Sequence, residues 1–130
     1  MTSAPNPASG EPALDRAPGD VRTVTAAHGG TGTTRLRRVE GLDGAPWFML
    51  DWEFPPGTGE GPHHHGDEPI GCEQYYVTQG QVTVIVGGVR YDLAEGDAIA
   101  VPRTMVRELT NDSDRTARIL LLVERLVPHR

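Results

Sequence analysis

Residues 57–80 read GTGEGPHHHGDEPIGCEQYYVTQG, and this stretch decides the fold. Three of the chain's five histidines are consecutive in it, and Glu73 follows eight residues after the last of them. Side chains of an extended strand alternate between two faces, and each residue advances the chain by about 3.3 Å. In a strand, His63 and His65 therefore share one face and His64 points to the other. Two imidazoles and one carboxylate that converge on a point form the half-shell used by non-haem iron, manganese, nickel and zinc sites.

The spacing of these residues resembles the first signature of the cupin family. That signature is a glycine, five residues, His-x-His, a short gap, a glutamate, six residues and a glycine, and the matching positions are Gly57, His63, His65, Glu73 and Gly80. The gap before the glutamate is longer here than is usual in the family. Glu68 lies nearer the usual spacing, but only Glu73 keeps the distance to Gly80. The resemblance implies one divalent transition metal ion (Fe, Mn, Ni or Zn) on His63, His65 and Glu73.

One hairpin later, the chain is similar to the second cupin signature at fewer places. The five positions of that signature are occupied by Gly96, Pro102, Thr104, Arg107 and Asn111. The glycine, proline and asparagine match. Thr104 replaces the turn glycine, and Arg107 replaces the histidine that would be the fourth metal ligand. The resemblance spans about residues 35–125 and supports the barrel better than it supports the metal.

Arg107 leaves two arrangements of the site open. In the first, a divalent ion on the three ligands keeps open positions, and the guanidinium binds a substrate carboxylate or a developing oxyanion. In the second, no metal binds, Arg107 pairs with Glu73, and the histidines act as acid and base groups. Strand alternation places Tyr75 on the face of Glu73, where it either donates a hydrogen bond to substrate or fills the barrel. Arg107 and Tyr75 are the predicted catalytic residues.

The rest of the chain predicts an all-β fold. Turn signals recur roughly every 8–12 residues from about residue 35, and no long segment has helical periodicity. Gly87–Gly88 is a two-residue hairpin signal. With the resemblance, this pattern predicts a cupin-like jelly-roll β-barrel in one domain, residues 21–130. The expected strands are Leu36–Val39, Trp47–Phe54, Pro62–His65, Glu73–Thr78, Gln81–Val86, Val89–Leu93, Ala98–Val101, Val106–Thr110 and Ala117–Arg125.

Composition limits the partners. The chain has 130 residues, a formal net charge of −6, and no lysine among its 12 basic residues. Nucleic acid and anionic membranes are therefore not expected partners, and Schiff-base chemistry is excluded. The lone Cys72 rules out an internal disulfide, and no apolar run approaches the ~20 residues that span a bilayer, which fits a cytoplasmic protein. Residues 1–20, rich in Pro, Ala, Gly and Ser, are expected to form a disordered tail, and residues 28–34 a loop.

The resemblance implies a small-molecule enzyme with its site inside the barrel, and a homodimer, because small cupins usually pair. Family activities include dioxygenation, isomerisation or epimerisation, decarboxylation and polyketide cyclisation. Two histidines, a carboxylate and an arginine suit an anionic or enolisable substrate. We therefore expect a metal-dependent enzyme of small-molecule metabolism, with secondary metabolism included. A non-catalytic cupin that binds a ligand or a metal stays open as the alternative.

Overall fold

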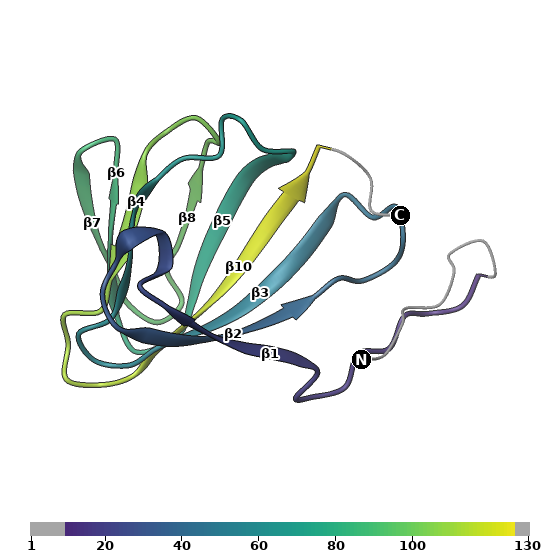
Figure 1. Ribbon diagram of the computed structural model, residues 1–130, viewed down its shortest axis with the longest axis horizontal. Coiled ribbons are helices and arrows are strands. Elements are labelled where there is room, and N and C mark those ends of the chain that lie inside the picture. Colours follow the sequence, from purple (N-terminus) through teal and green to yellow (C-terminus); the bar gives the residue numbers. More distant parts are fainter. Residues whose placement is uncertain (1–9, 127–130) are drawn as a thin grey trace.

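A computed structural model describes residues 10–126, which fold into ten β-strands and one short 3-10 turn, η2 (Figure 1). The bounds of these elements are β1 Asp20–Thr25, η2 Ala27–Gly29, β2 Thr33–Val39, β3 Trp47–Phe54, β4 Gly59–His63, β5 Ile70–Gln79, β6 Val82–Val86, β7 Val89–Leu93, β8 Ala98–Val101, β9 Arg107–Thr110 and β10 Ala117–Arg125.

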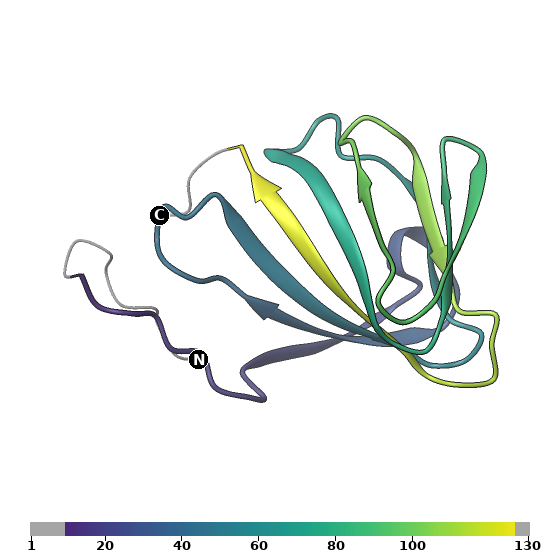
Figure 2. The same cartoon turned by 180° about the vertical axis from the view of Figure 1, so that it is seen from behind.

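Two antiparallel sheets face each other across a common core (Figures 1 and 2). The larger sheet has the order β1-β2-β3-β10-β5-β8, and the smaller has the order β4-β9-β6-β7. The C-terminal strand β10 lies between β3 and β5, so the end of the sequence occupies the middle of the larger sheet. The expected all-β jelly-roll barrel is confirmed.

Strand alternation sends one set of side chains into the barrel. In β5, Glu73, Tyr75 and Val77 are buried, whereas Gln74 and Tyr76 are exposed. The other strands that enclose the core contribute apolar residues in the same way, which removes their surface from water and supplies the main driving force for folding. The large core side chains are Phe48, Trp52, Phe54, Tyr75, Val77, Val84, Val101, Leu109, Ile119, Leu121 and Val123.

The N-terminal region holds more β-structure than the sequence indicated. β3, β7, β8 and β10 have the expected bounds, but β1 was not expected, and β2 begins at Thr33, inside the expected loop 28–34. The two strands pair with each other along their length, from Asp20 opposite Arg38 to Thr25 opposite Thr33. This pairing is a tertiary contact, which local composition does not reveal.

The strand that carries the histidines also starts earlier than expected. β4 begins at Gly59, where the sequence predicted Pro62, because Gly59 and Glu60 pair with β9. By composition, the glycine-rich stretch Pro55–Gly61 is interpreted as a turn. His65 lies beyond the end of β4, in a loop where its amide donates a hydrogen bond to the carbonyl of Arg103 (2.9 Å).

Residues 1–9 of the expected tail lie outside the described residues. Residues 10–19 precede β1, and Nη2 of Arg37 donates to the main-chain oxygen and to Oδ1 of Asp15 (3.0 and 2.9 Å). The disorder of the tail stays a prediction. Within residues 10–126, no helix has the length and apolar character of a membrane span.

Asn111, the last position of the second cupin-like signature, joins two connections at the base of the barrel. Its Nδ2 donates to the carbonyls of Phe54 and Arg115 (2.8 Å each). Its Oδ1 accepts hydrogen bonds from the amide and the hydroxyl of Ser113 (3.0 and 2.7 Å). Because this side chain is fully buried, it satisfies backbone groups that would otherwise lose their hydrogen bonds away from water.

We predict that Asn111→Ala lowers the free energy of unfolding by about 2–4 kcal/mol, since it removes the buried amide that donates to the Phe54 and Arg115 carbonyls and accepts from Ser113. Urea denaturation measures this loss. Asp114→Ala, an exposed change in the same loop, is the control and should stay within about 0.5 kcal/mol of wild type. Equal losses in the two variants would contradict the role given to Asn111.

Candidate metal centre

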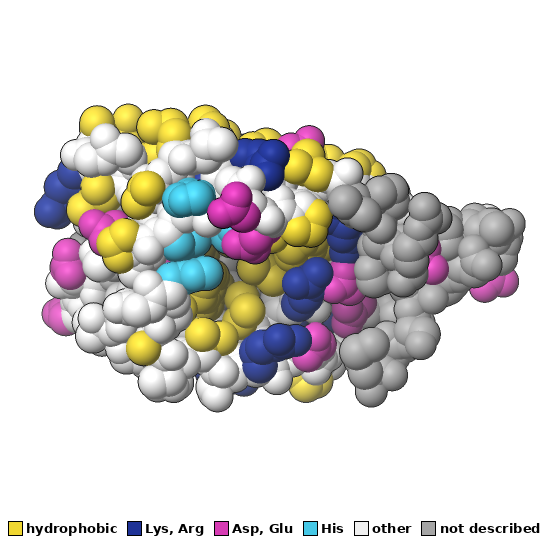
Figure 3. All heavy atoms as spheres, turned by 45° about the horizontal axis from the view of Figure 1, so that its top comes forward, with side chains coloured by type: hydrophobic (Ala, Val, Ile, Leu, Met, Phe, Trp, Pro, Cys, Tyr) yellow, Lys and Arg dark blue, Asp and Glu magenta, His cyan; other side chains and the backbone are white. Residues whose placement is uncertain are grey.

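A cavity of about 340 Å³ brings apolar and titratable side chains together. Its apolar wall includes Phe48, Leu50 and Trp52 from β3 and Leu121 and Val123 from β10. Figure 3 shows histidine side chains gathered at the mouth of this hollow, beside acidic side chains and above apolar ones. The titratable residues that line it are His28, Arg38, Glu60, His63, His65, Glu68 and Glu73.

The three ligands predicted from the sequence lie together. One donor atom each from His63, His65 and Glu73 falls within 4.8 Å of the others. The ring centroids of the two histidines are 5.0 Å apart, with an angle of 74° between the ring planes. His64 is exposed, and its Nδ1 accepts a hydrogen bond from the amide of Gly66 (3.0 Å). The predicted separation of His64 from its two neighbours is confirmed.

Hydrogen bonds at Nδ1 of His63 and of His65 orient both imidazoles and leave Nε2 of each ring towards the proposed ion. Nδ1 of His63 lies 2.9 Å from the carbonyl of Gly61, which can only accept, so Nδ1 carries the proton and Nε2 keeps a lone pair. Nδ1 of His65 lies 3.0 Å from Oε1 of Glu68. Metal-bound histidines typically donate their second N–H to a carbonyl or a carboxylate in this way. Glu68, which the spacing offered as an alternative ligand, therefore orients the ring of His65 through its hydrogen bond with Nδ1.

The charges around the two rings set their protonation. Burial lowers the pKa of His63 to about 4, so this ring is neutral near pH 7 and offers a lone pair. The Glu73 carboxylate, which accepts a hydrogen bond from His65, raises the pKa of His65 against the effect of burial. Nε2 of His65 is buried and lies 3.3 Å from Oε1 of Glu73.

Glu73 is the charged centre of the cavity floor. Nη1 of Arg107 donates to its Oε1 over 2.5 Å. Burial alone raises the pKa of Glu73, but hydrogen bonds and charges from His65 and Arg107 outweigh burial and lower it. The carboxylate is therefore ionised at neutral pH.

Arg107 does not contact the cavity. Its side chain is fully buried and is absent from the cavity lining. Besides Glu73, the guanidinium donates to the carbonyls of Pro102 (2.6 Å) and Met105 (3.0 Å from Nε). The expected role as a substrate clamp lacks support in this geometry, because most of its donors are already used. Met105, two residues before Arg107, would share its face in a continued strand, but it precedes β9 and is 40% exposed.

Like Arg107, Tyr75 is fully buried and does not line the cavity. Its hydroxyl donates to Oε1 of Glu60 over 3.0 Å. Of the two interpretations left open by the sequence, the packed ring fits this position. Burial raises the pKa of Glu60 to about 8, and the negative charge of Glu73 adds to this effect. Glu60 is only 3% exposed, yet it lines the cavity, where it holds a proton near neutral pH.

Sequence reasoning missed Glu60 and His28. Glu60 lay in a stretch interpreted as a turn, and its pairing with Leu109 of β9 is what turns the side chain inward. His28 comes from η2, far from the signature in sequence, and its ring stacks on His63 with centroids 3.6 Å apart. The only local signal was His28 itself, a single histidine at the start of the loop sequence HGGTGTT, and one histidine in a loop does not indicate a site.

His28, Glu60 and His63 form a second group of donor atoms within 4.8 Å of one another. An imidazole lone pair lies in the ring plane, so two rings bind one ion only where their planes cross. The planes of His63 and His65 cross at 74°, whereas those of His28 and His63 differ by 9° and are stacked. In the observed rotamers, the ion therefore fits the group of His63, His65 and Glu73.

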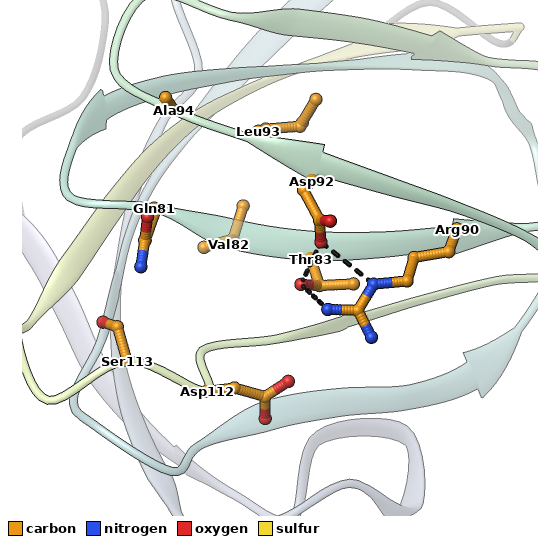
Figure 4. A pocket seen from close by; sticks show the side chains of 9 residues that line it. All are labelled: Gln81, Val82, Thr83, Arg90, Asp92, Leu93, Ala94, Asp112 and Ser113. Carbon is orange, nitrogen blue, oxygen red and sulfur yellow. Dashed lines mark hydrogen bonds and ion pairs between the residues drawn. The ribbon is translucent and has the colours of Figure 1, made fainter.

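A hollow on the smaller sheet has a similar volume of about 360 Å³ but different chemistry (Figure 4). Its polar groups bind one another, because the Thr83 hydroxyl and Nε of Arg90 both donate to Oδ1 of Asp92 (2.8 and 3.0 Å). Arg90 and Asp92 are largely exposed, and no histidine or cysteine lines the hollow. This surface carries no functional assignment.

Comparison with known proteins identifies the family. The family model for the cupin domain matches residues 50–123, more than half of the chain, so the chain belongs to the cupin family. A search of the curated proteins found no match.

Solved structures show the same fold. A predicted oxalate decarboxylase from Thermotoga maritima has 18% identity and a TM-score of 0.73, over 87% of this chain and 99% of that one. A Cupin 2 conserved barrel domain protein from Salinispora arenicola has 20% identity and a TM-score of 0.64, over 85% and 84%. KdgF from Halomonas sp. has 21% identity and a TM-score of 0.63, over 82% and 86%. At these identities the likeness concerns the fold alone.

The buried ion pair predicts a large effect of Arg107→Met on stability. Removing the cation leaves Glu73 charged and buried, which should cost about 3–5 kcal/mol in urea denaturation. Adding Glu73→Gln to this variant should recover part of the loss, because the unpaired charge disappears. Arg90→Met, at an exposed ion pair, is the matched control with little effect. A loss for Arg107→Met no larger than for the control would contradict the pairing.

The raised pKa of Glu60 predicts that the stability of the metal-free protein depends on pH. Its pKa rises from 4.5 to about 8 on folding, so the folded state keeps a proton that the unfolded state releases. Its contribution to stability is therefore present below pH ~4.5 and is lost as pH rises towards ~8. Glu60→Gln cannot ionise, so its melting temperature relative to wild type should increase by several degrees between about pH 6 and 8.5. A constant difference across this range would refute the raised pKa.

Proposed function

We propose that this cupin is a metal-dependent enzyme that acts on a small molecule with an anionic or enolisable group. One divalent transition metal ion is bound by His63, His65 and Glu73. The observation that carries the proposal is the convergence of three donor atoms, one each from His63, His65 and Glu73, within 4.8 Å of one another. The two imidazole rings cross at 74°, so their in-plane lone pairs can be directed at one point. A metal ion at that point would bind all three groups.

The cavity suits a small anionic ligand. Its volume of about 340 Å³ falls within the usual size range of small-molecule sites. Arg38 lines it, with the guanidinium 4.0 Å above the ring of Phe48 and a salt bridge to Glu40. A guanidinium at a cavity wall matches a carboxylate through two parallel hydrogen bonds. Arg38 thus takes the substrate-binding role that the sequence had suggested for Arg107.

Each protein group has a separate task in such a reaction. The ion, when bound, polarises a carbonyl or enolate oxygen. Arg107 fixes the Glu73 carboxylate, and the hydroxyl of Tyr75 fixes Glu60. Glu60 carries a proton at the cavity wall near neutral pH and can exchange it with the substrate. Arg107 and Tyr75 are therefore positioning residues in this scheme, and Glu60 performs the proton transfer.

A proton-holding carboxyl beside the ligands favours proton-transfer chemistry. Isomerisation, epimerisation and decarboxylation each move a proton to or from carbon, so they use such a group directly. Among the family activities, we therefore place these ahead of dioxygenation and cyclisation. The predicted homodimer, the cytoplasmic location and a role in secondary metabolism stay predictions.

A metal-free acid/base isomerase is the second candidate. The ion pair of Arg107 with Glu73 favours it, because Arg107 neutralises this carboxylate without any metal. Turnover that persists in the presence of a chelator would support it. A cupin that binds its ligand or metal without turnover is the remaining alternative, and substrate screening with metal-loaded protein separates it from the enzyme.

The metal site predicts different effects for three consecutive histidines. Protein purified without a histidine tag should contain about one transition metal ion per chain by elemental analysis. His63→Ala and His65→Ala should each remove most of it, because two of three ligands cannot hold the ion tightly. His64→Ala, the matched control, should keep it, because His64 is exposed and points away. Loss of metal in His64→Ala with retention in His63→Ala would contradict the assignment.

A further inference from the structure

The proposed ligand set has one imidazole fewer than the family pattern, because Arg107 occupies the fourth ligand's place. The structure brings another imidazole to the opposite end of the ligand group. His28 lies in η2, outside the residues that match the family model, yet its ring centroid is 3.6 Å from that of His63 and 6.2 Å from that of His65.

Two glycines allow η2 to approach β4 this closely. A Cβ on Gly30 would lie 2.3 Å from the carbonyl oxygen of Gly59, and a Cβ on Gly61 would lie 2.3 Å from that of His28. Thr31 and Gly59 exchange two backbone hydrogen bonds beside them (3.2 and 3.0 Å). The turn that carries His28 is therefore fixed to the strand that carries His63, as Figure 1 shows for η2 beside β4.

The donor atoms at this end of the cavity also suit a cation. Oε2 of Glu60 lies 3.9 Å from Nε2 of His63, and this buried carboxyl has no arginine at ion-pair distance among the described residues. Glu73, in contrast, already pairs with Arg107, whose positive charge repels a metal ion. Repulsion from Arg107 thus favours an ion position on the side of His63 where His28 lies.

We propose that His28 is an additional ligand of the metal ion and supplies the imidazole that Arg107 replaced. This inference rests on the proposed metal site. The rings of His28 and His63 are stacked at 9°, so His28 must rotate about its side-chain bonds for its lone pair to reach the ion. Its side chain is exposed, so this rotation gives up the stacking on His63 and little other packing.

The experiment uses the full-length, untagged, metal-free protein titrated with Co²⁺, whose visible absorption reports the number and type of ligands. The main variant is His28→Asn, because His28 has a φ of 49° and asparagine tolerates this left-handed conformation. The matched control is His64→Asn, at an exposed histidine between the two ligand histidines in sequence. Melting temperatures of the metal-free proteins show whether the η2 turn is intact.

His28→Asn should bind Co²⁺ at least about 10–100-fold more weakly than wild type, with an altered spectrum and an unchanged melting temperature of the metal-free protein. His64→Asn should match wild type in Co²⁺ affinity, in the spectrum and in the melting temperature of the metal-free protein. If His28→Asn destabilises the metal-free protein, His28→Gly provides a second variant, because glycine adopts positive φ freely. Added imidazole should then restore the wild-type spectrum.

The inference is overturned if His28→Asn binds Co²⁺ with wild-type affinity and spectrum, or if imidazole fails to restore the spectrum of His28→Gly. The proposed metal site survives either result, provided that His63→Ala still abolishes binding. If wild type itself binds no Co²⁺, the proposed metal site fails and this inference fails with it.

Discussion

A buried carboxylate inside the barrel is the constraint on which the structure depends. Glu73 points inward from β5 and is 4% exposed, so its charge must be balanced by a cation or by hydrogen bonds. Arg107 from β9 provides the cation, and the two strands belong to different sheets. The ion pair therefore links the sheets across the core. The remaining donors of Arg107 bind the carbonyls of Pro102 and Met105, which fixes the connection from β8 to β9.

The same pair shapes the chemistry of the cavity. A divalent ion 5 Å from a guanidinium is repelled by roughly 6–7 kcal/mol at an effective dielectric constant of 20. Glu73 lies between the two cations in our account and offsets part of this repulsion. Glu68 adds negative charge beside His65. Arginine at the fourth ligand's place is thus compatible with a metal ion only because carboxylates surround it.

Much of the fold and part of the site followed from the sequence. The alternation around Tyr75 depends on the two-residue period of a strand, which local sequence carries. His64 is separated from His63 and His65 as predicted, but β4 ends at His63, so the loop and not strand alternation sets the orientation of the other two histidines. His28 and Glu60 could not be predicted, because contacts between distant segments place them: η2 against β4, and β4 against β9. The burial of Arg107 behind Glu73 likewise depends on how the two sheets pack. Local pattern gives the direction of a side chain, but not the neighbours it meets.

The most direct test of the metal site is anomalous X-ray scattering from crystals of the metal-loaded, untagged protein. Data collected on both sides of the absorption edge of the bound metal locate the ion without assumptions about its ligands. Our account predicts one peak per chain, about 2.0–2.3 Å from Nε2 of His63, Nε2 of His65 and an oxygen of Glu73. The absence of any peak at saturating metal, with Arg107 and Glu73 still paired, would contradict it and leave a metal-free site.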